Sequence, residues 1–578
     1  MVGQVAELKA RMGHVSDDKA ASIVELWDRW ARARNSKVEE WKELRNYIFA
    51  TDTSTTSNSD MWKNSTTMPK LCQIRDNLHS NYLSSIFPNE NWIRWEAYDR
   101  QAAQIDVKDA ITQYMSTKLK QYGFRDVVSD LIYDYIDYGN CFAEAVWEEG
   151  SMFQSAGGVV SKRYTGPGTE RISPLDIVFN PTSSTFGKAP KIIRYIKTLG
   201  EIAKLAEDDP VWADAHAKIK TVRSGAGAYG VDDWNKAVAF QIDGFGDMYE
   251  YFTSQYVEVL RFLGDYYDPM TSQLHRETEI LIVDRAITVV ERQIPNYLGQ
   301  GNIAHAGWRK RPDNLYAMGP LDNQIGMQYR IDHLQNLKAD AMDLIVHPPL
   351  VIVGDVEPFT WGPSEVISIT GEGSVTELGK NLSGLVAADQ EINMLEARME
   401  EYAGAPKQAM GIRTPGEKTA YEVQTLENAA GRIFQEKTVT FEVMLEQLMN
   451  GMLSEAQDNL GREQLPVLDP EFGGTKFVDI TGKDIIQNGL IRPVGARHFG
   501  QQAILIQNIS NTMNGPLGQM IAPHISSKNL AALIEDLFEL RRFDLIRNNV
   551  AVEEGIEREQ LMGAAQENLM VEQAIPGA

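Results

Sequence analysis

Apolar residues recur at steps of three and four along much of the chain, which is the period of an amphipathic helix. The first such stretch covers residues 16–49. Its repeating apolar positions are Trp27, Trp30, Trp41, Leu44 and Ile48. The pattern therefore predicts a long helix, and the polar run TDTSTTSNSD at residues 51–60 predicts a loop after it.

An aromatic cluster follows in the stretch YLSSIFPNENWIRWEAYD, which begins at Tyr82. Leu78, Tyr82 and Ile86 lie four residues apart, on one face of a helix predicted for residues 68–87. Pro88 and the asparagines beside it predict a turn, and WIRWEAY then resembles the start of a strand. We therefore expect a helix–turn–strand corner whose aromatic side chains pack in the core.

The pattern changes character after a further helical region. Residues 105–148 are predicted to be largely helical. From about residue 150 to 315 come short β-branched and aromatic runs, such as YVEVLRFLGDYYD and TEILIVDRAITVVERQ, separated by turn residues. This alternation predicts an antiparallel sheet lobe, which helix and a loop interrupt at residues 196–236.

A short β-like insertion between two helices is the most informative pattern in the chain. The first helix is predicted from Leu321 to about Ile345, and at 1.5 Å per residue it would be about 36 Å long. Its apolar repeat consists of Leu334, Leu337, Ala341 and Leu344. Residues 346–373 predict a small β module, because β-branched runs alternate there with prolines and glycines. Residues 376–402 predict the second helix.

The C-terminal part of the chain is predicted to be mainly helical. The expected elements are a loop at 403–418, the longest helix at 419–457, a β piece within 464–493, helices from 496 to about 548 and a polar tail at 551–578. Together these elements predict an α+β fold.

Bulk composition limits the class of protein. A chain of 578 residues is expected to form two to four domains, and 43% hydrophobic residues suffice for a sizeable core. No run of about 18 apolar residues occurs, so we expect no membrane span, and the N-terminus lacks the apolar region of a signal peptide. Cys72 and Cys141 are the only cysteines, which fits a reducing cytosol. The net charge of −24 argues against a protein that grips nucleic acid over a broad surface.

Candidate chemistry is weak throughout. Gly225 to Gly230, GAGAYG, fits a dinucleotide-binding spacing, but no apolar strand precedes it, so a surface loop is the better interpretation. The nine histidines show no metal-ligand spacing, and carboxylate pairs such as Glu148–Glu149 are common surface features. We therefore expect no enzyme, no cofactor and no metal.

One group of positive charges stands out in the loop at residues 403–418. Lys407, Arg413 and Lys418 lie between two predicted helices in a chain that is short of cations. An ordinary basic loop and a loop that touches a polyanion are both compatible with this pattern.

The order of these elements resembles the portal, or head–tail connector, proteins of short-tailed bacteriophages. The similar stretches are LSSIFPNENWIRWEAYD, YDYIDYGNCFAEAVW, RISPLDIVFNPTSS and GIRTPGEKTAYEVQTLENAAGRIFQ. The resemblance covers roughly residues 20–550, and none of its motifs is catalytic. It implies a wing at 1–319, stem helices at 320–345 and 376–402, a clip at 346–375, a tunnel loop at 403–418, a long wing helix and β return at 419–495, a helical crown at 496–550 and a polar tail at 551–578.

The resemblance also implies a function. Portals form rings, usually dodecamers, at one capsid vertex, where they conduct double-stranded DNA during packaging and ejection. The implied partners are the large terminase ATPase, a tail adaptor, and the major capsid and scaffolding proteins; the location is the virion, after assembly in the host cytoplasm. Lys407, Arg413 and Lys418 would face DNA, and the clip candidates for motor or adaptor docking are Phe359, Trp361 and Val366.

Two alternatives remain open at this point. Another virion structural protein, such as a tail adaptor or minor capsid protein, would not need the helix–β–helix hairpin. A nucleotide-dependent enzyme would use Gly225–Gly230, and a cofactor titration without saturable binding would exclude it.

Overall fold

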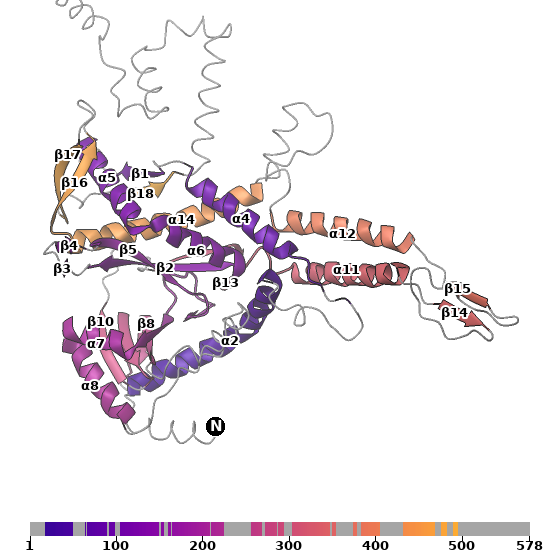
Figure 1. The fold of residues 1–578 in the computed structure, drawn as a ribbon. Helices are drawn as coiled ribbons and strands as arrows, with labels where there is room; N and C mark the ends of the chain where they lie inside the picture. The colour runs from indigo at the N-terminus through magenta and orange to yellow at the C-terminus, as the bar shows by residue number, and fades with distance from the viewer. Residues whose placement is uncertain are drawn as a thin grey trace, which may run out of the picture. The chain divides into compact units, whose positions relative to one another are not determined.

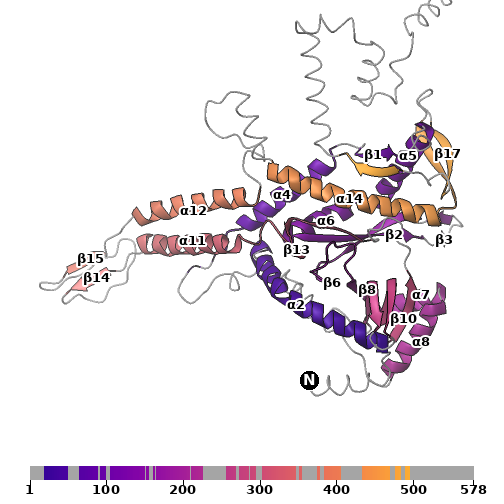
Figure 2. The same ribbon diagram turned by 180° about the vertical axis from the view of Figure 1, so that it is seen from behind.

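The fold is that of a computed structural model, drawn from two sides in Figures 1 and 2. The structure describes residues 18–49, 64, 66–88, 92–98, 105–149, 152–154, 160–162, 164–208, 210–224, 256–268, 272–285, 287–293, 303–346, 350–353, 374–377, 383–404, 432–468, 475–482 and 489–494. The chain divides into two compact units. Unit 1 comprises residues 1–84 and 118–456, and unit 2 comprises residues 85–117 and 457–578. Helices and antiparallel strands mix in the chain, so the α+β class is confirmed.

A five-stranded antiparallel sheet forms one centre of unit 1, and its strand order is β10-β9-β8-β7-β6. The strands are β6 (Ile177–Phe179), β7 (Lys191–Thr198), β8 (Tyr256–Asp268), β9 (Gln273–Val283) and β10 (Ile287–Gln293). Helices α7 (Leu199–Asp208) and α8 (Pro210–Ser224) lie between β7 and β8 in sequence. The predicted sheet lobe with a helical interruption is therefore confirmed.

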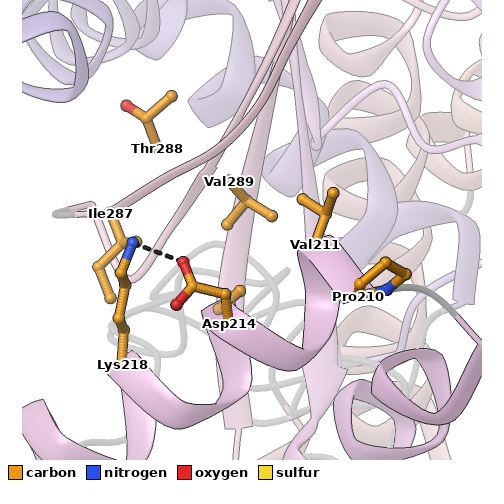
Figure 3. Close-up of a pocket in the computed structure, with 8 residues that line it drawn as sticks. Pro210, Val211, Asp214, Lys218, Ile287, Thr288 and Val289 are labelled. Atoms are coloured by element: carbon orange, nitrogen blue, oxygen red, sulfur yellow. Dashed lines mark ion pairs between the residues drawn. The ribbon is translucent and has the colours of Figure 1, made fainter.

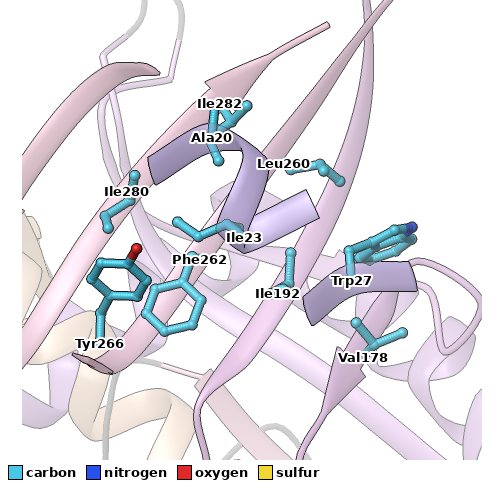
Figure 4. Packing of buried hydrophobic residues seen from close by; sticks show 10 residues of the cluster. All are labelled: Ala20, Ile23, Trp27, Val178, Ile192, Leu260, Phe262, Tyr266, Ile280 and Ile282. Atoms are coloured by element: carbon cyan, nitrogen blue, oxygen red, sulfur yellow. The ribbon is translucent and has the colours of Figure 1, made fainter. Parts of the chain in front are cut away.

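Alternating side chains of the long strand β8 serve two different cores, as the two-residue period of a strand requires. Leu260 and Phe262 pack against α2 (Asp18–Phe49), together with Ile23 and Trp27 of that helix (Figure 4). Val257, on the opposite face of the strand, packs with side chains of α7 and α8. Helices therefore cover both faces of this sheet.

The α2 helix is fastened to the sheet by a buried arginine as well as by apolar side chains. Arg34 is only 5% exposed, and its guanidinium donates to the carbonyl oxygens of Pro174 (2.6 Å), Leu175 (2.9 Å) and Ile177. A guanidinium carries five donors in a rigid fork, so one side chain satisfies several backbone acceptors that burial would otherwise leave unpaired. This anchor fixes α2 against the start of β6.

A second, three-stranded sheet of order β11-β2-β5 packs against the first. Its strands are β2 (Asn140–Glu148), β5 (Gly166–Ile172) and β11 (Ile303–Gly307). Phe142 of β2 and Phe179 of β6 meet in the shared core, with ring centroids 5.8 Å apart. Shorter pairs join β3 (Met152–Gln154) to β4 (Val160–Lys162) and β12 (Arg309–Arg311) to β13 (Asn314–Met318).

The prediction of helix across residues 105–148 is correct only for its first part. Helices α5 (Ile105–Tyr122) and α6 (Phe124–Asp137) occupy that part, but residues 140–148 form the strand β2. The first six residues of β2 are all buried, so both of its faces are covered and it lacks the alternation that marks a half-exposed strand.

Gly139 and Asn140 form the junction between α6 and β2. Gly139 has a φ of 67°, and a Cβ at this position would lie 2.3 Å from the backbone nitrogen of Gly319. Asn140 is fully buried; its amide donates to the carbonyl oxygens of Tyr138 (3.1 Å) and Ala317 (3.0 Å), and its Oδ1 accepts from the Ala317 N–H (3.0 Å). The Asn140 side chain thus links the start of β2 to Ala317 in β13.

Two further helices lie mainly in unit 1, namely α4 (Lys70–Ile86) and α14 (Arg432–Asn459). Tyr82 of α4 stacks on Phe434 of α14, with centroids 4.6 Å apart, and its hydroxyl accepts from the Trp308 indole at 3.0 Å. The predicted helix at 419–457 is observed from residue 432, and 419–431 lie outside the described residues. Its described part has 28 residues against 32 in α2, and the prediction that it is the longest helix stays a prediction.

Unit 2 holds the aromatic corner. Here the chain leaves α4, turns, and enters β1 (Ile93–Ala97), which pairs with β18 (Gly489–Pro493). Phe87 and Trp92 make an edge-to-face contact with centroids 4.7 Å apart, and Trp95 is 2% exposed. The predicted corner is therefore confirmed as core packing. A separate pair joins β16 (Arg462–Leu468) to β17 (Thr475–Thr481), which confirms the expected β piece.

Candidate functional site: the two-helix arm

Two helices and a strand pair form an arm within unit 1. The chain runs out along α11 (Ile325–Val346), turns through β14 (Leu350–Val353) and β15 (Ser374–Glu377), and returns along α12 (Ser383–Tyr402). In both views the two helices lie side by side and the strand pair lies at their far end (Figures 1 and 2). The predicted helix–β–helix hairpin is confirmed, and the arm is the name used below for these four elements.

The bounds of the arm differ from those predicted in two places. The first helix begins at Ile325 rather than Leu321, and residues 374–377, part of which was assigned to the second helix, form β15. Within the described residues the second helix begins at Ser383, and residues 378–382 lie outside them. The conformation of β15 is decided by its pairing with β14, which lies more than twenty residues earlier in the chain. The helical period of a sequence carries no information about such a distant partner.

Ion pairs link the two arm helices along their exposed sides. Arg330 Nε lies 3.1 Å from Glu391 Oε1, and Lys338 pairs with Asp389. The Arg330 and Glu391 side chains are 47% and 38% exposed, and pairs of this kind contribute about 0.2–1 kcal/mol. These pairs favour one alignment of the two helices along their length but contribute little to the free energy of their association.

A buried ion pair holds the base of the arm. Lys70, the first residue of α4, places Nζ 2.6 Å from Oε1 of Glu400 on α12, and the two side chains are 8% and 7% exposed. Glu396, one turn earlier, lies 3.9 Å from the same Nζ. Because burial removes both charges from water, loss of either partner would leave the other uncompensated.

Part of the buried face of α11 is polar, although Ile331 and Leu334 are buried there too. Gln328, Asp332 and Asn336 lie four residues apart and are 0%, 2% and 1% exposed. Their acceptor oxygens receive the backbone N–H groups of Leu71, Met68 and Thr66 at 3.3, 2.8 and 2.8 Å. This polar stripe escaped sequence reasoning, which assigned the buried face from apolar residues alone.

The predicted apolar stripe of α11 is only partly buried. Leu334 is 7% exposed, but Leu337 and Leu344 are 37% and 58% exposed. The arm is rich in such exposed groups: of eighteen large hydrophobic side chains that are exposed among the described residues, eleven lie on it. They are Tyr329, Leu337, Met342, Leu344, Val346, Val351, Ile352, Val353, Val386, Met394 and Tyr402. Concentrated exposed apolar surface marks a site of contact with another macromolecule.

The arm is also acidic. Its two helices contain eight Asp or Glu residues against three Lys or Arg residues. Because carboxylates repel phosphates, such helices would not retain a polyanion by charge.

The residues that the sequence proposed for the site fall outside the part of the chain that the structure describes. These are the tunnel-loop candidates Lys407, Arg413 and Lys418, the clip candidates Phe359, Trp361 and Val366, and the glycine-rich run Gly225–Gly230. Their assignments therefore stay predictions.

A small cavity of about 320 Å³ lies between α8 and β10 (Figure 3). Asp214 and Lys218 face it from one side and form an ion pair of 2.7 Å, with side chains 67% and 55% exposed. Ile287 and Val289 line the strand side, while the Thr288 side chain points away from the pair. A solvated ion pair beside apolar side chains supplies no nucleophile or activated base.

Buried titratable groups elsewhere in unit 1 have structural partners. Burial, with the charges of Lys310 and Lys191, lowers the pKa of His305 to about 3, and the ring stacks on Phe142 at 4.8 Å. Burial raises the pKa of Asp134 to about 6, although Arg171 opposes this with two hydrogen bonds of 2.6 Å. Within the described ranges no three His, Cys, Asp or Glu side chains gather as a metal site would require.

None of the described helices is long and apolar enough to cross a bilayer.

Comparison with known proteins adds little. No family model matches the chain, and no curated protein matches it. Among solved structures, a chain from the virion of a native gene transfer agent particle is similar at a TM-score of 0.33 and 10% sequence identity. The similarity covers 71% of this chain and 80% of that chain. A TM-score this low does not establish a common fold.

Proposed function

We propose that the chain is a portal protein of a short-tailed bacteriophage, which forms a ring at one capsid vertex and conducts double-stranded DNA. The observation that carries the proposal is the arm. Two helices with a strand pair at their far end match the stem and clip implied by the sequence resemblance. In this proposal α11 and α12 are the stem helices, and the segment between them is the clip.

Exposed apolar side chains on the arm support assembly into a ring. A single copy leaves eleven large hydrophobic side chains of the arm in water. In a ring of cyclic symmetry one face of each subunit meets a different face of its neighbour, so both sides of an arm would be covered. The expected number of subunits is about twelve, by the resemblance alone.

The acidic arm supports a passive role in DNA movement. A duplex carries one negative charge per about 1.7 Å, so helices with an excess of carboxylates would repel it and let it slide. Lys407, Arg413 and Lys418 would then brake or hold the DNA at a single level. The work of packaging would belong to a separate terminase ATPase, and we propose no catalytic role for this chain.

Negative-stain electron microscopy of the purified protein tests ring formation. The expected result is ring-shaped particles with an axial hole. The variant Leu344→Asp/Val346→Asp places two charges on the apolar surface of the arm and should reduce the ring population strongly. Leu274→Asp, at a residue of β9 that is 53% exposed, is the matched control and should form rings normally. Monomers or dimers of the wild type at all protein and salt concentrations would contradict the proposal.

The clip is tested by replacing residues 346–375 with a short flexible linker. The expected outcome is loss of binding to the packaging ATPase and the tail adaptor, measured by co-sedimentation with particles. If assembly and ATPase binding both persist, the chain is a different virion structural protein. Neutralising Lys407, Arg413 and Lys418 together should leave rings intact and impair DNA retention.

A further inference from the structure

Four backbone N–H groups that precede or begin α4 are held by side chains of α11. Besides the three donors already described, the Asn64 N–H donates to Asp340 Oδ1 at 3.0 Å. The donors are spaced by two residues through Asn64, Thr66 and Met68, and the acceptors by four residues through Asp340, Asn336 and Asp332. We call Asn64 and residues 66–68 the strap; residue 65 lies outside the described residues.

The two spacings match because of backbone geometry. Four residues of an α-helix rise about 6.0 Å, and two residues of an extended chain advance about 6.6 Å. Successive donors of an extended strap therefore meet successive acceptors on one helix face. The contact uses these backbone N–H groups together with the Asn64 side-chain amide, which donates to Asp340 Oδ1 at 2.7 Å and to Asp343 Oδ2 at 3.0 Å.

The chemistry of the contact favours reversible docking. The acceptors on α11 are amides and carboxylates, which water solvates equally well when the strap leaves. The strap buries little apolar surface: Thr66 is exposed, Asn64 and Met68 are half-buried, and the buried Thr67 has a short polar side chain. Segments with few buried apolar contacts open at much lower cost than the core.

We propose that Asn64 and residues 66–68 are a releasable strap that locks α11 to α4, and that its release lets the arm change its angle within unit 1. The strap runs directly into Lys70, whose ion pair with Glu400 holds α12. The same short stretch of chain therefore fastens both arm helices. This inference concerns the arm alone and does not depend on ring formation.

Asp332 gives the strap a dependence on pH. Burial raises the pKa of Asp332 to about 6, against hydrogen bonds from the Met68 N–H and the Gln328 amide. Its Oδ2 is buried without a hydrogen-bond partner among the described residues. The titratable groups that interact with it include Tyr47 of α2, whose own pKa is raised by burial and then by the charges of Glu43, Asp332 and Tyr329. The docked state thus favours protonated Asp332, and ionisation as pH rises through about 6 weakens docking.

Hydrogen–deuterium exchange of the full-length protein, read on peptides that cover the strap, tests the proposal. Asn336→Ala removes one acceptor and should speed strap exchange by about two- to tenfold, the ratio that loss of one neutral hydrogen bond gives. Asn450→Ala is the matched control, because Asn450 is a buried helix residue that bonds within its own helix, to the Glu446 carbonyl. It should leave strap exchange unchanged. If Asn336→Ala does not fold, Asp340→Ala tests the outer acceptor in the same way.

A distance measurement tests the unlocking of the arm. Spin labels at Leu344→Cys on α11 and Leu274→Cys on β9, in a Cys72→Ser background, should give a broader distance distribution when Asn336→Ala is added. Strap amides that exchange as slowly as those of β8 in every variant would overturn the strap. Faster exchange of the strap amides with an unchanged distance distribution would overturn the proposal that release of the strap lets the arm change its angle. Asp332→Asn should slow strap exchange at pH 8 but not at pH 4, after correction for chemical exchange rates; equal effects at both pH values would overturn the role of Asp332.

Discussion

The buried pair of Lys70 and Glu400 allows a quantitative test of how the base of the arm is held. Lys70→Met keeps most of the aliphatic stem but removes the charge that lies 2.6 Å from the Glu400 carboxylate. Removing one partner of a buried ion pair costs about 3–5 kcal/mol, because the other charge stays desolvated. Glu396, 3.9 Å from the same ammonium, would be left beside Glu400 as a second negative charge and would add to the cost.

Arg330→Met is the matched control, since it breaks an ion pair that also ends on α12 but joins it to α11 on an exposed side of the arm. That pair is 47% and 38% exposed, so its loss should cost about 0.2–1 kcal/mol. The double variant Lys70→Met/Glu400→Leu removes both buried charges and should recover most of the stability, because an apolar pair of similar volume replaces the ion pair.

Urea denaturation followed by tryptophan fluorescence measures these differences. A cost of about 3 kcal/mol should lower the midpoint of the affected transition by roughly 1 M, given a urea slope of about 3 kcal/mol per M. Because the chain has two units, transitions are compared individually rather than as one free energy. If Lys70→Met and Arg330→Met shift the midpoint equally, or if the double variant is no better than Lys70→Met, the buried pair does not hold the arm as argued.

Three further outcomes are expected. Gly139→Ala should abolish soluble folded protein, because its Cβ would lie 2.3 Å from Gly319 N and its φ is positive; the soluble yield of the expressed variant measures this. Gly326→Ala, with nothing within 4 Å of its Cβ, should raise the melting temperature slightly in thermal unfolding. Asn140→Ala should cost about 3–5 kcal/mol, since two carbonyl oxygens and one N–H lose a buried partner, and an urea midpoint near wild type would contradict this. The pKa of Asp332 is raised above its unfolded value, so its contribution to stability falls as pH rises from about 4 to 6. Asp332→Asn should remove this fall. The variant should therefore melt at a higher temperature than wild type at pH 8 and at the same temperature at pH 4.

Local sequence signals were sufficient for several elements. The strands β8 and β9 were predictable from β-branched and aromatic runs bounded by turn residues, and the helix α2 from an apolar repeat of three to four residues. Residues 140–148 were predicted wrongly as helix, because β2 is covered on both faces and its apolar run carries no strand period.

The sequence by itself determined the order of elements, the aromatic corner and the two helices of the arm with their β insertion. Tertiary structure alone decided which distant strands pair, such as β1 with β18, because hydrogen bonding between strands leaves no local signal. It also decided that α11 buries Gln328, Asp332 and Asn336 while Leu344 stays exposed. That helix face lies against the backbone of residues 66–71, whose N–H groups find their acceptors on α11. A buried N–H donor requires an acceptor more strongly than it requires apolar contact.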